Sequence, residues 1–293
     1  MSEAQYFKEF CDNLIIVPDK RSTISTRYKA ITNRLNTDFW NDPSETLFSR
    51  YVGSYGRNTS IKNESDIDMI FVLPAHMKST YDNYSYNGQS ALLQAVSKSI
   101  QKTYSTSTVG ANGQVVSVIF TDGVNFEVVP AFENSDKSYT FPDANGGGSW
   151  RKTDPHPEIN KISEEDPKLN YNLKRLCKMT RAWKGFCSVP MGGLLIDTLA
   201  YNFLKNWPHR NESYLYYDLM VRDFFEYLKN QNETQAYWYA LGSNQLIYRK
   251  GNFEYKAKLA YNKAIEAIQL QKDNKEWSSK QKWREIYGYE FPS

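Results

Sequence analysis

The chain has 293 residues, of which 40% are hydrophobic and 24% charged, so it can form one large domain or two ordinary ones with a substantial core. Its net charge of +3 is a mild excess that does not favour a nucleic-acid binder. Three cysteines without a C-x-x-C pair or a histidine cluster fit neither a disulfide framework nor a zinc site. Since no apolar run approaches the ~18 residues of a membrane span and no signal peptide is evident, we expect a soluble, cytoplasmic protein without a membrane partner.

The first half of the chain is predicted to be a mixed α/β lobe. Residues 3–17 and 22–40 have helical patterns, and residues 90–104 form an amphipathic helix by the i, i+3, i+4 spacing of their apolar residues. Thr121-Asp122-Gly123 separates two β-rich runs, and Asp-Gly in that position is a strong hairpin signal. The short β-rich runs are residues 47–52, 66–73, 115–120 and 124–132.

A long polar segment, residues 133–167, follows the last of these runs. A loop of this length is unusual inside a compact domain and is commonly either functional or disordered. Tyr139, Phe141 and Trp150 indicate that part of it packs on something. Disorder and a packed functional loop both stay open at this point.

The second half is predicted to be an all-helical lobe. Pro167 is expected to open a helix that runs to residue 186, with an apolar stripe from Leu169 to Trp183. The fold class expected from this order is α+β, with an N-terminal domain at residues 1–165 and a helical domain at residues 166–293. Further helices are predicted at residues 192–207, 216–231 and 255–273.

Two aspartates open the run at residues 66–73. In a strand, residues i and i+2 point to the same side, so Asp66 and Asp68 project together, about 5–7 Å apart. At an effective dielectric constant of ~20 their charges repel by about 3 kcal/mol, which a cation between them would relieve. Mg²⁺ prefers carboxylate oxygens and commonly bridges one or two of them to substrate phosphates. The pair therefore points to a metal and phosphate site.

The residues before this strand suit a phosphate. Gly53 and Gly56 let the backbone approach an anion closely, and Ser54 adds a hydroxyl donor. The Walker pattern G-x-x-x-x-G-K-[ST] is absent. Arg57 and Lys62 offer positive charge, and both could equally be solvated turn residues.

Glu127 is the candidate for a third acid. It lies in the second strand of the predicted hairpin, and it would reach the same metal if that strand lies beside residues 66–73. Asn125, Glu127 and Val129 share one strand face, which could also simply be solvated. Both interpretations stay open.

The order Gly53-Ser54, eleven residues, Asp66-Ile67-Asp68 and a later acidic strand resembles the polymerase-β-type nucleotidyltransferases. The stretch GSYGRNTSIKNESDIDMIFVL and the helix LKRLCKMTRAWKGF look like the oligoadenylate synthetase and cyclic GMP-AMP synthase branch. Within it, SWRKTDP, VPMGGLLIDTLAYNFL and YWYALGSNQLIY resemble the bacterial cyclic-oligonucleotide synthases of antiphage signalling, the CD-NTases. The resemblance covers roughly residues 20 to 270. It implies a polymerase-β-like lobe, a helical lobe and an active site in the cleft between them.

The resemblance also implies roles for individual residues. Gly53 and Ser54 would hold the triphosphate, with Arg57 as a further candidate, while Asp66, Asp68 and Glu127 would be the catalytic carboxylates that ligate Mg²⁺, with Mn²⁺ as an alternative. Lys178 and Arg181 would meet phosphates, although related synthetases usually carry lysine at the latter position and aspartate at the third carboxylate. Tyr248, Tyr237 and Trp150 are candidates for stacking on bases.

The implied function is the synthesis of a cyclic di- or trinucleotide second messenger from NTPs, with release of pyrophosphate, by two-metal catalysis in bacterial antiphage (CBASS) signalling. The alternatives are an RNA-end or protein-modifying nucleotidyltransferase and a non-catalytic nucleotide sensor. The expected partners are ATP, GTP or pyrimidine NTPs, and a downstream effector would bind the product rather than the protein. A nucleic-acid activator is not expected, although a folate-like or RNA regulator is left open.

Overall fold

The computed structural model describes residues 3–63 and 66–293 and divides into two compact units. The sheet unit takes residues 17–56 and the described residues of 64–156, and the helical unit takes the described residues of 1–16 together with 57–63 and 157–293. The predicted division at 165/166 therefore falls inside a helix of the helical unit. The N-terminal segment also belongs to the helical unit, because its aromatic side chains are part of that unit's core.

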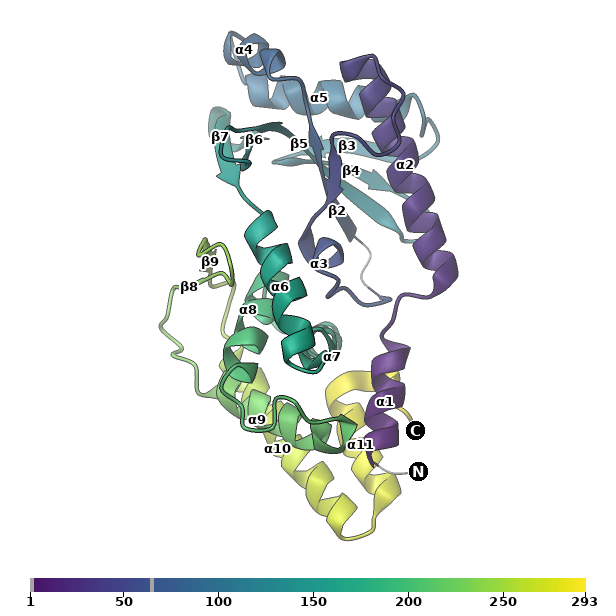
Figure 1. Cartoon of the computed structure of the whole chain (residues 1–293), viewed down its shortest axis with the longest axis vertical. Helices are drawn as coiled ribbons and strands as arrows, with labels where there is room; N and C mark the ends of the chain where they lie inside the picture. Colours follow the sequence, from purple (N-terminus) through teal and green to yellow (C-terminus); the bar gives the residue numbers. More distant parts are fainter. Residues whose placement is uncertain (1–2, 64–65) are drawn as a thin grey trace. The chain divides into compact units, whose positions relative to one another are not determined.

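The sheet unit is built on a mixed seven-stranded sheet (Figure 1). The main strand order is β1-β2-β5-β4-β3, with β6 pairing with β5 and β7 with β6. Only the β2–β5 pair is parallel among the pairs described, which sets the carboxyl ends of these two strands at the same edge. The strands are β1 (Ser49–Tyr51), β2 (Asp66–Val72), β3 (Thr108–Asn112), β4 (Val115–Ile119), β5 (Asn125–Glu133), β6 (Tyr139–Asp143) and β7 (Ser149–Thr153).

Helices α2 (Pro18–Trp40) and α5 (Gly88–Gln101) lie beside this sheet, and the short α3 (Gly53–Gly56) and α4 (His76–Asp82) precede and follow β2 (Figure 1). One face of β2 is packed in the core, because Ile67, Met69 and Phe71 on that face are buried. The predicted helices over residues 22–40 and 90–104 and the hairpin at residues 121–123, which joins antiparallel β4 and β5, are confirmed.

The polar segment at residues 133–167, for which disorder and a packed loop were both left open, is an ordered part of the structure. It forms the β6–β7 hairpin and α6 (His156–Lys168). Tyr139 is buried, and the indole nitrogen of Trp150 donates a hydrogen bond to Asp82 at 2.6 Å. The aromatic residues that suggested packing are therefore what holds the segment.

The prediction that Pro167 opens a helix is wrong. Pro167 lies in the last turn of α6, and the next helix, α7 (Asn172–Phe186), begins after a break. The break, residues 169–171, contains two residues with positive φ, Asn170 at 51° and Tyr171 at 61°, which end the helical path. The apolar stripe predicted for this region is confirmed, since its members from Leu169 to Trp183 are buried.

The helical unit has one large apolar core. It also contains a two-stranded hairpin, β8 (Tyr237–Tyr239) with β9 (Leu246–Tyr248), so the predicted all-helical lobe needs correction. In residues 3–63 and 66–293, no helix combines the length and apolar character that a membrane span requires. Besides α6 and α7, the helices are α1 (Glu3–Asn13), α8 (Gly193–Leu204), α9 (Tyr217–Lys229), α10 (Glu254–Lys272) and α11 (Glu276–Tyr287), with 3₁₀ turns at Tyr214–Tyr216 and Gly288–Glu290.

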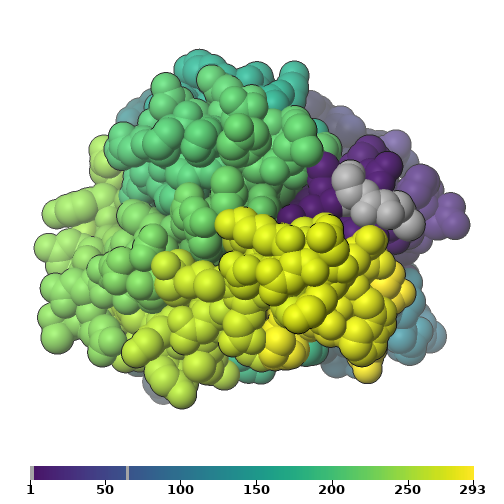
Figure 2. Space-filling view, turned by 90° about the horizontal axis from the view of Figure 1, so that it is seen from below, coloured from purple at the N-terminus to yellow at the C-terminus, as the bar shows by residue number. Residues whose placement is uncertain are grey.

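The two ends of the chain share this core. Phe7 of α1 packs edge-on against Trp283 of α11 and Phe291, with ring centroids 5.1 Å and 5.3 Å away. Figure 2 shows the N-terminal segment in purple lying against the C-terminal helices in yellow. The α1 helix is thus an integral part of the helical unit.

Candidate active site

Three carboxylates occupy neighbouring positions on β2 and β5. The parallel register pairs Asp66 with Asn125 and Asp68 with Glu127. Adjacent strands lie about 4.8 Å apart, so Glu127 stands directly beside Asp68. The amide of Asn125 donates to Asp66 at 3.4 Å. The sheet therefore brings together, from positions about sixty residues apart, the three acids that the sequence singled out.

The electrostatics of this group suit a cation. Burial raises the pKa of Glu127, and the negative charge of Asp66 raises it further. An acid whose ionisation is opposed by a neighbouring acid is stabilised in its charged form by a bound metal. The oxygen-only donor set fits a hard divalent ion such as Mg²⁺. In the described part of the chain no group of three or more His, Cys, Asp or Glu side chains is placed so that it could hold a metal ion.

The Gly53-Ser54 turn lies directly on one of these carboxylates. Gly53 has a φ of +60°, and a Cβ placed on it would lie 1.7 Å from Oδ2 of Asp68, so only glycine fits here. The backbone N–H of Val52 donates to the Asp68 carbonyl at 2.9 Å, and the N–H of Gly56 donates to the Val52 carbonyl at 2.8 Å. These bonds hold the turn, with Ser54 in it, at the amino end of β2.

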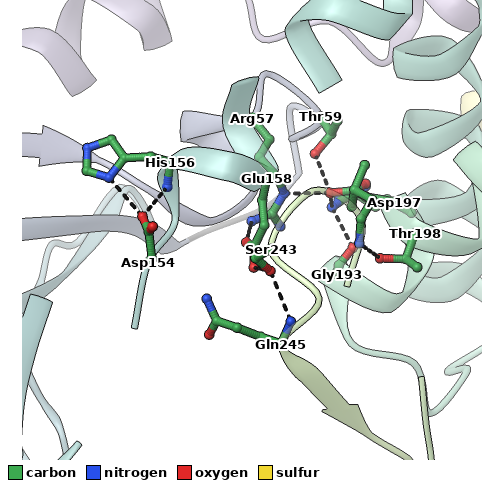
Figure 3. Close-up of polar contacts among 12 residues, drawn as sticks. Arg57, Thr59, Asp154, His156, Glu158, Gly193, Asp197, Thr198, Ser243 and Gln245 are labelled. Carbon is green, nitrogen blue, oxygen red and sulfur yellow. Dashed lines mark hydrogen bonds and ion pairs between the residues drawn. The ribbon is translucent and has the colours of Figure 1, made fainter. Parts of the chain in front are cut away.

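Arg57 lies in a buried polar cluster of the helical unit (Figure 3). Its Nε donates to Oδ2 of Asp197 at 2.8 Å, and the hydroxyl of Thr59 donates to the same oxygen at 3.0 Å. Glu158 approaches the Arg57 guanidinium at 3.7 Å and accepts a hydrogen bond from Ser243 at 2.9 Å. The segment at residues 57–63 is thereby fixed to helices α6 and α8.

Arg181 of α7 binds the same aspartate. Its guanidinium donates to Oδ1 of Asp197 at 2.6 Å and to Oδ2 at 3.0 Å, a bidentate pair, and also to the Gly193 carbonyl at 3.1 Å. The side chain of Arg181 is only 1% exposed. Burial raises the pKa of Asp197, but the charges and hydrogen bonds of Arg181 and Arg57 outweigh it and lower that pKa to about 2. The cluster thus holds an ionised aspartate between two guanidinium groups.

This cluster gives both arginines a structural role that the sequence did not suggest. Arg57 and Arg181 both donate hydrogen bonds to Asp197, and a nucleotide-binding role for either stays a prediction. Asp197 itself was not among the candidate residues. The available signal was its position as the one acid in the apolar helix GLLIDTLAYNFL, where a buried charge needs a partner.

Lys178 and Tyr248 lie at other places in the helical unit. Lys178 lines a pocket of about 200 Å³ that also includes Lys174, Arg175 and Tyr171. Tyr248 is 66% exposed on β9, where it faces Tyr237 across the β8–β9 hairpin. Their proposed contacts with phosphate and base therefore stay predictions.

Comparison with known families identifies the first part of the chain. A family model described as "Second Messenger Oligonucleotide or Dinucleotide Synthetase domain" matches residues 1–166. A probable cyclic nucleotide synthase of Bacillus cereus (strain VD146) is 24% identical over 184 residues, which cover 57% of this chain and 52% of that protein. The chain thus spans about half the length of the curated relative that it matches.

Solved structures resemble nearly the whole chain. CdnC of E. coli MS115-1, solved as a CdnC:HORMA-deltaN complex, has a TM-score of 0.69 at 13% identity and covers 99% of this chain and 98% of its own. CdnG of Bradyrhizobium diazoefficiens, solved with GTP, has a TM-score of 0.67 at 9% identity and covers 97% and 94%. DncV of Vibrio cholerae, a cyclic AMP-GMP synthase, has a TM-score of 0.63 at 12% identity and covers 84% and 69%. At these identities the likeness confirms the expected α+β fold.

Proposed function

Since the chain belongs to the Second Messenger Oligonucleotide or Dinucleotide Synthetase domain family and is a CD-NTase, we propose that it joins NTPs into a cyclic di- or trinucleotide with release of pyrophosphate. The product would be a second messenger of antiphage (CBASS) signalling, read by a downstream effector that does not need to touch this protein. The observation that carries the proposal is the placement of Asp68 between Glu127, its register partner, and Gly53, whose backbone lies against its carboxylate.

This placement supports a separate role for each group of residues in the site. Asp66, Asp68 and Glu127 would hold Mg²⁺, or Mn²⁺ in its place. When bound, such ions lower the pKa of an attacking ribose hydroxyl and neutralise the leaving pyrophosphate. The Gly53-Ser54 turn would bind the triphosphate through backbone N–H groups and the Ser54 hydroxyl, because no side chain at Gly53 blocks the approach. Glu127, half-buried beside Asp68, would orient the acceptor hydroxyl.

Which of the four NTPs the protein uses has to be determined by experiment. Solved relatives have been captured with ATP in the case of CdnC and with GTP in the case of CdnG. Purine NTPs are therefore the first substrates to try, with pyrimidine NTPs beside them.

The test incubates the purified protein with all four NTPs, radiolabelled at the α-phosphate, and with Mg²⁺ or Mn²⁺. A phosphatase-resistant product that disappears in Asp66→Asn/Asp68→Asn would support the proposal, and leaving out one NTP at a time would identify the bases. A product that phosphatase degrades, or transfer of label to added RNA or protein, would instead favour an RNA-end or protein-modifying nucleotidyltransferase. Tight NTP binding without any transfer would favour a sensor.

A further inference from the structure

A second pocket, of about 410 Å³, lies within the helical unit between the end of α7, α10 and α11. Small-molecule sites in proteins commonly have volumes of roughly 300–1,000 Å³. None of the residues predicted to bind a nucleotide or metal lines it. The pocket is therefore separate from the residues that are proposed to bind the nucleotide and the metal.

The floor of this pocket is apolar and fully buried. Trp183, Ala260 and Ile286 form it, with exposed fractions of 0%, 4% and 1%. The space exists because α10 turns a row of alanines toward its neighbours, and the short side chain of Ala260 leaves room above it. An apolar ring or chain would thus lose its contact with water on entering.

The walls are apolar as well, and one of them is fixed in place. The ring of Phe186, although 54% exposed, packs on the backbone of Gly288: a Cβ placed there would lie 2.7 Å from the ring. Leu259 of α10, 41% exposed, also lines the pocket. Two large apolar side chains are thus held partly in solvent around a pre-formed hollow, which favours a ligand over simple packing.

The charge at the rim is positive. Lys263 is paired with Glu285, which also receives Lys282 at 3.2 Å, so that carboxylate is already neutralised. Lys256 is different: its ammonium donates to the backbone carbonyl of Cys187 at 3.0 Å, and among the described residues no carboxylate lies within ion-pair distance of it. A cation held by one neutral carbonyl retains donors for an anion.

From the apolar floor, the fixed Phe186 wall and the acid-free Lys256, we infer that this pocket binds a small apolar anion. The ligand class is a flat aromatic or branched aliphatic group that carries one carboxylate, sulfonate or phosphate. The apolar part would lie over Trp183 and Ala260, and the anionic group would meet Lys256.

Cys187 provides a built-in reporter for the site. It lines the pocket and is half-buried, whereas Cys11 and Cys177 are 7% and 0% exposed. A thiol reagent should therefore modify Cys187 first, and an occupied pocket should protect it. The variant Cys187→Ser verifies which thiol reacts.

The experiment uses the full chain and two matched probes: anilinonaphthalene sulfonate, an apolar anion, and N-phenylnaphthylamine, which has the same rings without the charge. Saturating sulfonate should nearly stop alkylation of Cys187. Lys256→Met should weaken this protection by about tenfold, as expected for one hydrogen bond to a charged group, and should leave the uncharged probe unaffected. Lys258→Met, an exposed lysine two residues along α10, is the control and should change neither probe.

Ala260→Leu, which fills the space, should abolish protection by both probes. Its thermal unfolding shows whether the variant is folded, and Lys256→Met serves as the independent variant if it is not. Two results would overturn the inference. One is that saturating sulfonate leaves alkylation of Cys187 unchanged. The other is that the charged and the uncharged probe protect Cys187 equally well, both in the wild type and in Lys256→Met. Neither result depends on nucleotide synthesis, so this inference and the proposed function can fail separately.

Discussion

At the scale of single residues, the site depends on a glycine that no other residue can replace. Gly53 combines a φ of +60° with the carboxylate of Asp68 against its Cα, so any side chain would push that carboxylate out of its position. A side chain at Gly53 would both strain the backbone and displace the proposed catalytic carboxylate of Asp68, and comparison with another glycine separates the two effects.

Gly53→Ala should lower nucleotide transfer by about a hundredfold, because displacement of a catalytic group by ~1 Å costs that much. Gly123→Ala is the matched control: Gly123 also has a positive φ, +76°, but open space around it. Both variants should lose about 1–2 kcal/mol of stability from the left-handed backbone. Equal activity of the two variants would show that Gly53 does not position Asp68.

Local sequence pattern went further for the carboxylates than for the arginines. Strand periodicity predicts that Asp66 and Asp68 project together. The Asp-Gly hairpin places Glu127 in a strand but does not say which strand lies beside it, and the β2–β5 pairing supplies that. Arg57 and Asp197 are 140 residues apart in the sequence. Nothing local indicates that a turn residue will be buried against a helix of the other half, and so Arg57 looked like a solvated or ligand-binding residue.

At the scale of elements, Asp197 joins α7, α8 and the segment at residues 57–63. It accepts hydrogen bonds from Arg57, Thr59 and Arg181. Because removing one partner of a buried ion pair leaves an uncompensated charge, Asp197→Asn should cost about 3–5 kcal/mol in the free energy of unfolding. Urea unfolding measures this.

The control is Asp12→Asn, which removes an exposed ion pair with Lys8 in the same unit and should leave unfolding unchanged. Replacing the four charges of the cluster together, as Arg57→Met/Glu158→Gln/Arg181→Met/Asp197→Leu, should recover much of the loss, because none of these charges is then left unpaired. A single Asp197→Asn variant as stable as the wild type would refute the structural role of the cluster.

The same aspartate predicts a loss of stability in acid. The pKa of Asp197 is lowered from its ordinary value of 3.8 to about 2, so its contribution is complete above about pH 4 and is lost as the pH falls toward 2. Urea midpoints measured from pH 5 downward should fall more steeply in the wild type than in Asp197→Asn. Parallel curves would contradict an ionised Asp197.

At the scale of the whole molecule, the helical unit is closed by residues from both ends of the chain. Phe7 is fully buried and touches Trp283 and Phe291. Sequence predicted α1 as a helix but not its place, because an amphipathic helix does not specify which core it joins. The same holds for the predicted boundary at 165/166, which the chain crosses inside α6.

Phe7→Ala should therefore cost about 3–5 kcal/mol, the usual loss for a large aromatic side chain removed from a core. Glu9→Ala, on the exposed side of α1, should have little effect. Chemical denaturation followed by tryptophan fluorescence is suitable because Trp283 lies against Phe7. If the two variants unfold alike, α1 is not part of the helical core.

The central claim of this account is that Asp66, Asp68 and Glu127 together hold the divalent metal on which catalysis depends. The measurement that tests it most directly is Mn²⁺ binding, followed by electron paramagnetic resonance with a non-hydrolysable NTP present, in the wild type, Asp66→Asn/Asp68→Asn and Glu127→Gln. We predict bound Mn²⁺ in the wild type, nearly none in the double variant and weakened binding in Glu127→Gln. Equal Mn²⁺ binding by all three folded proteins would contradict the claim.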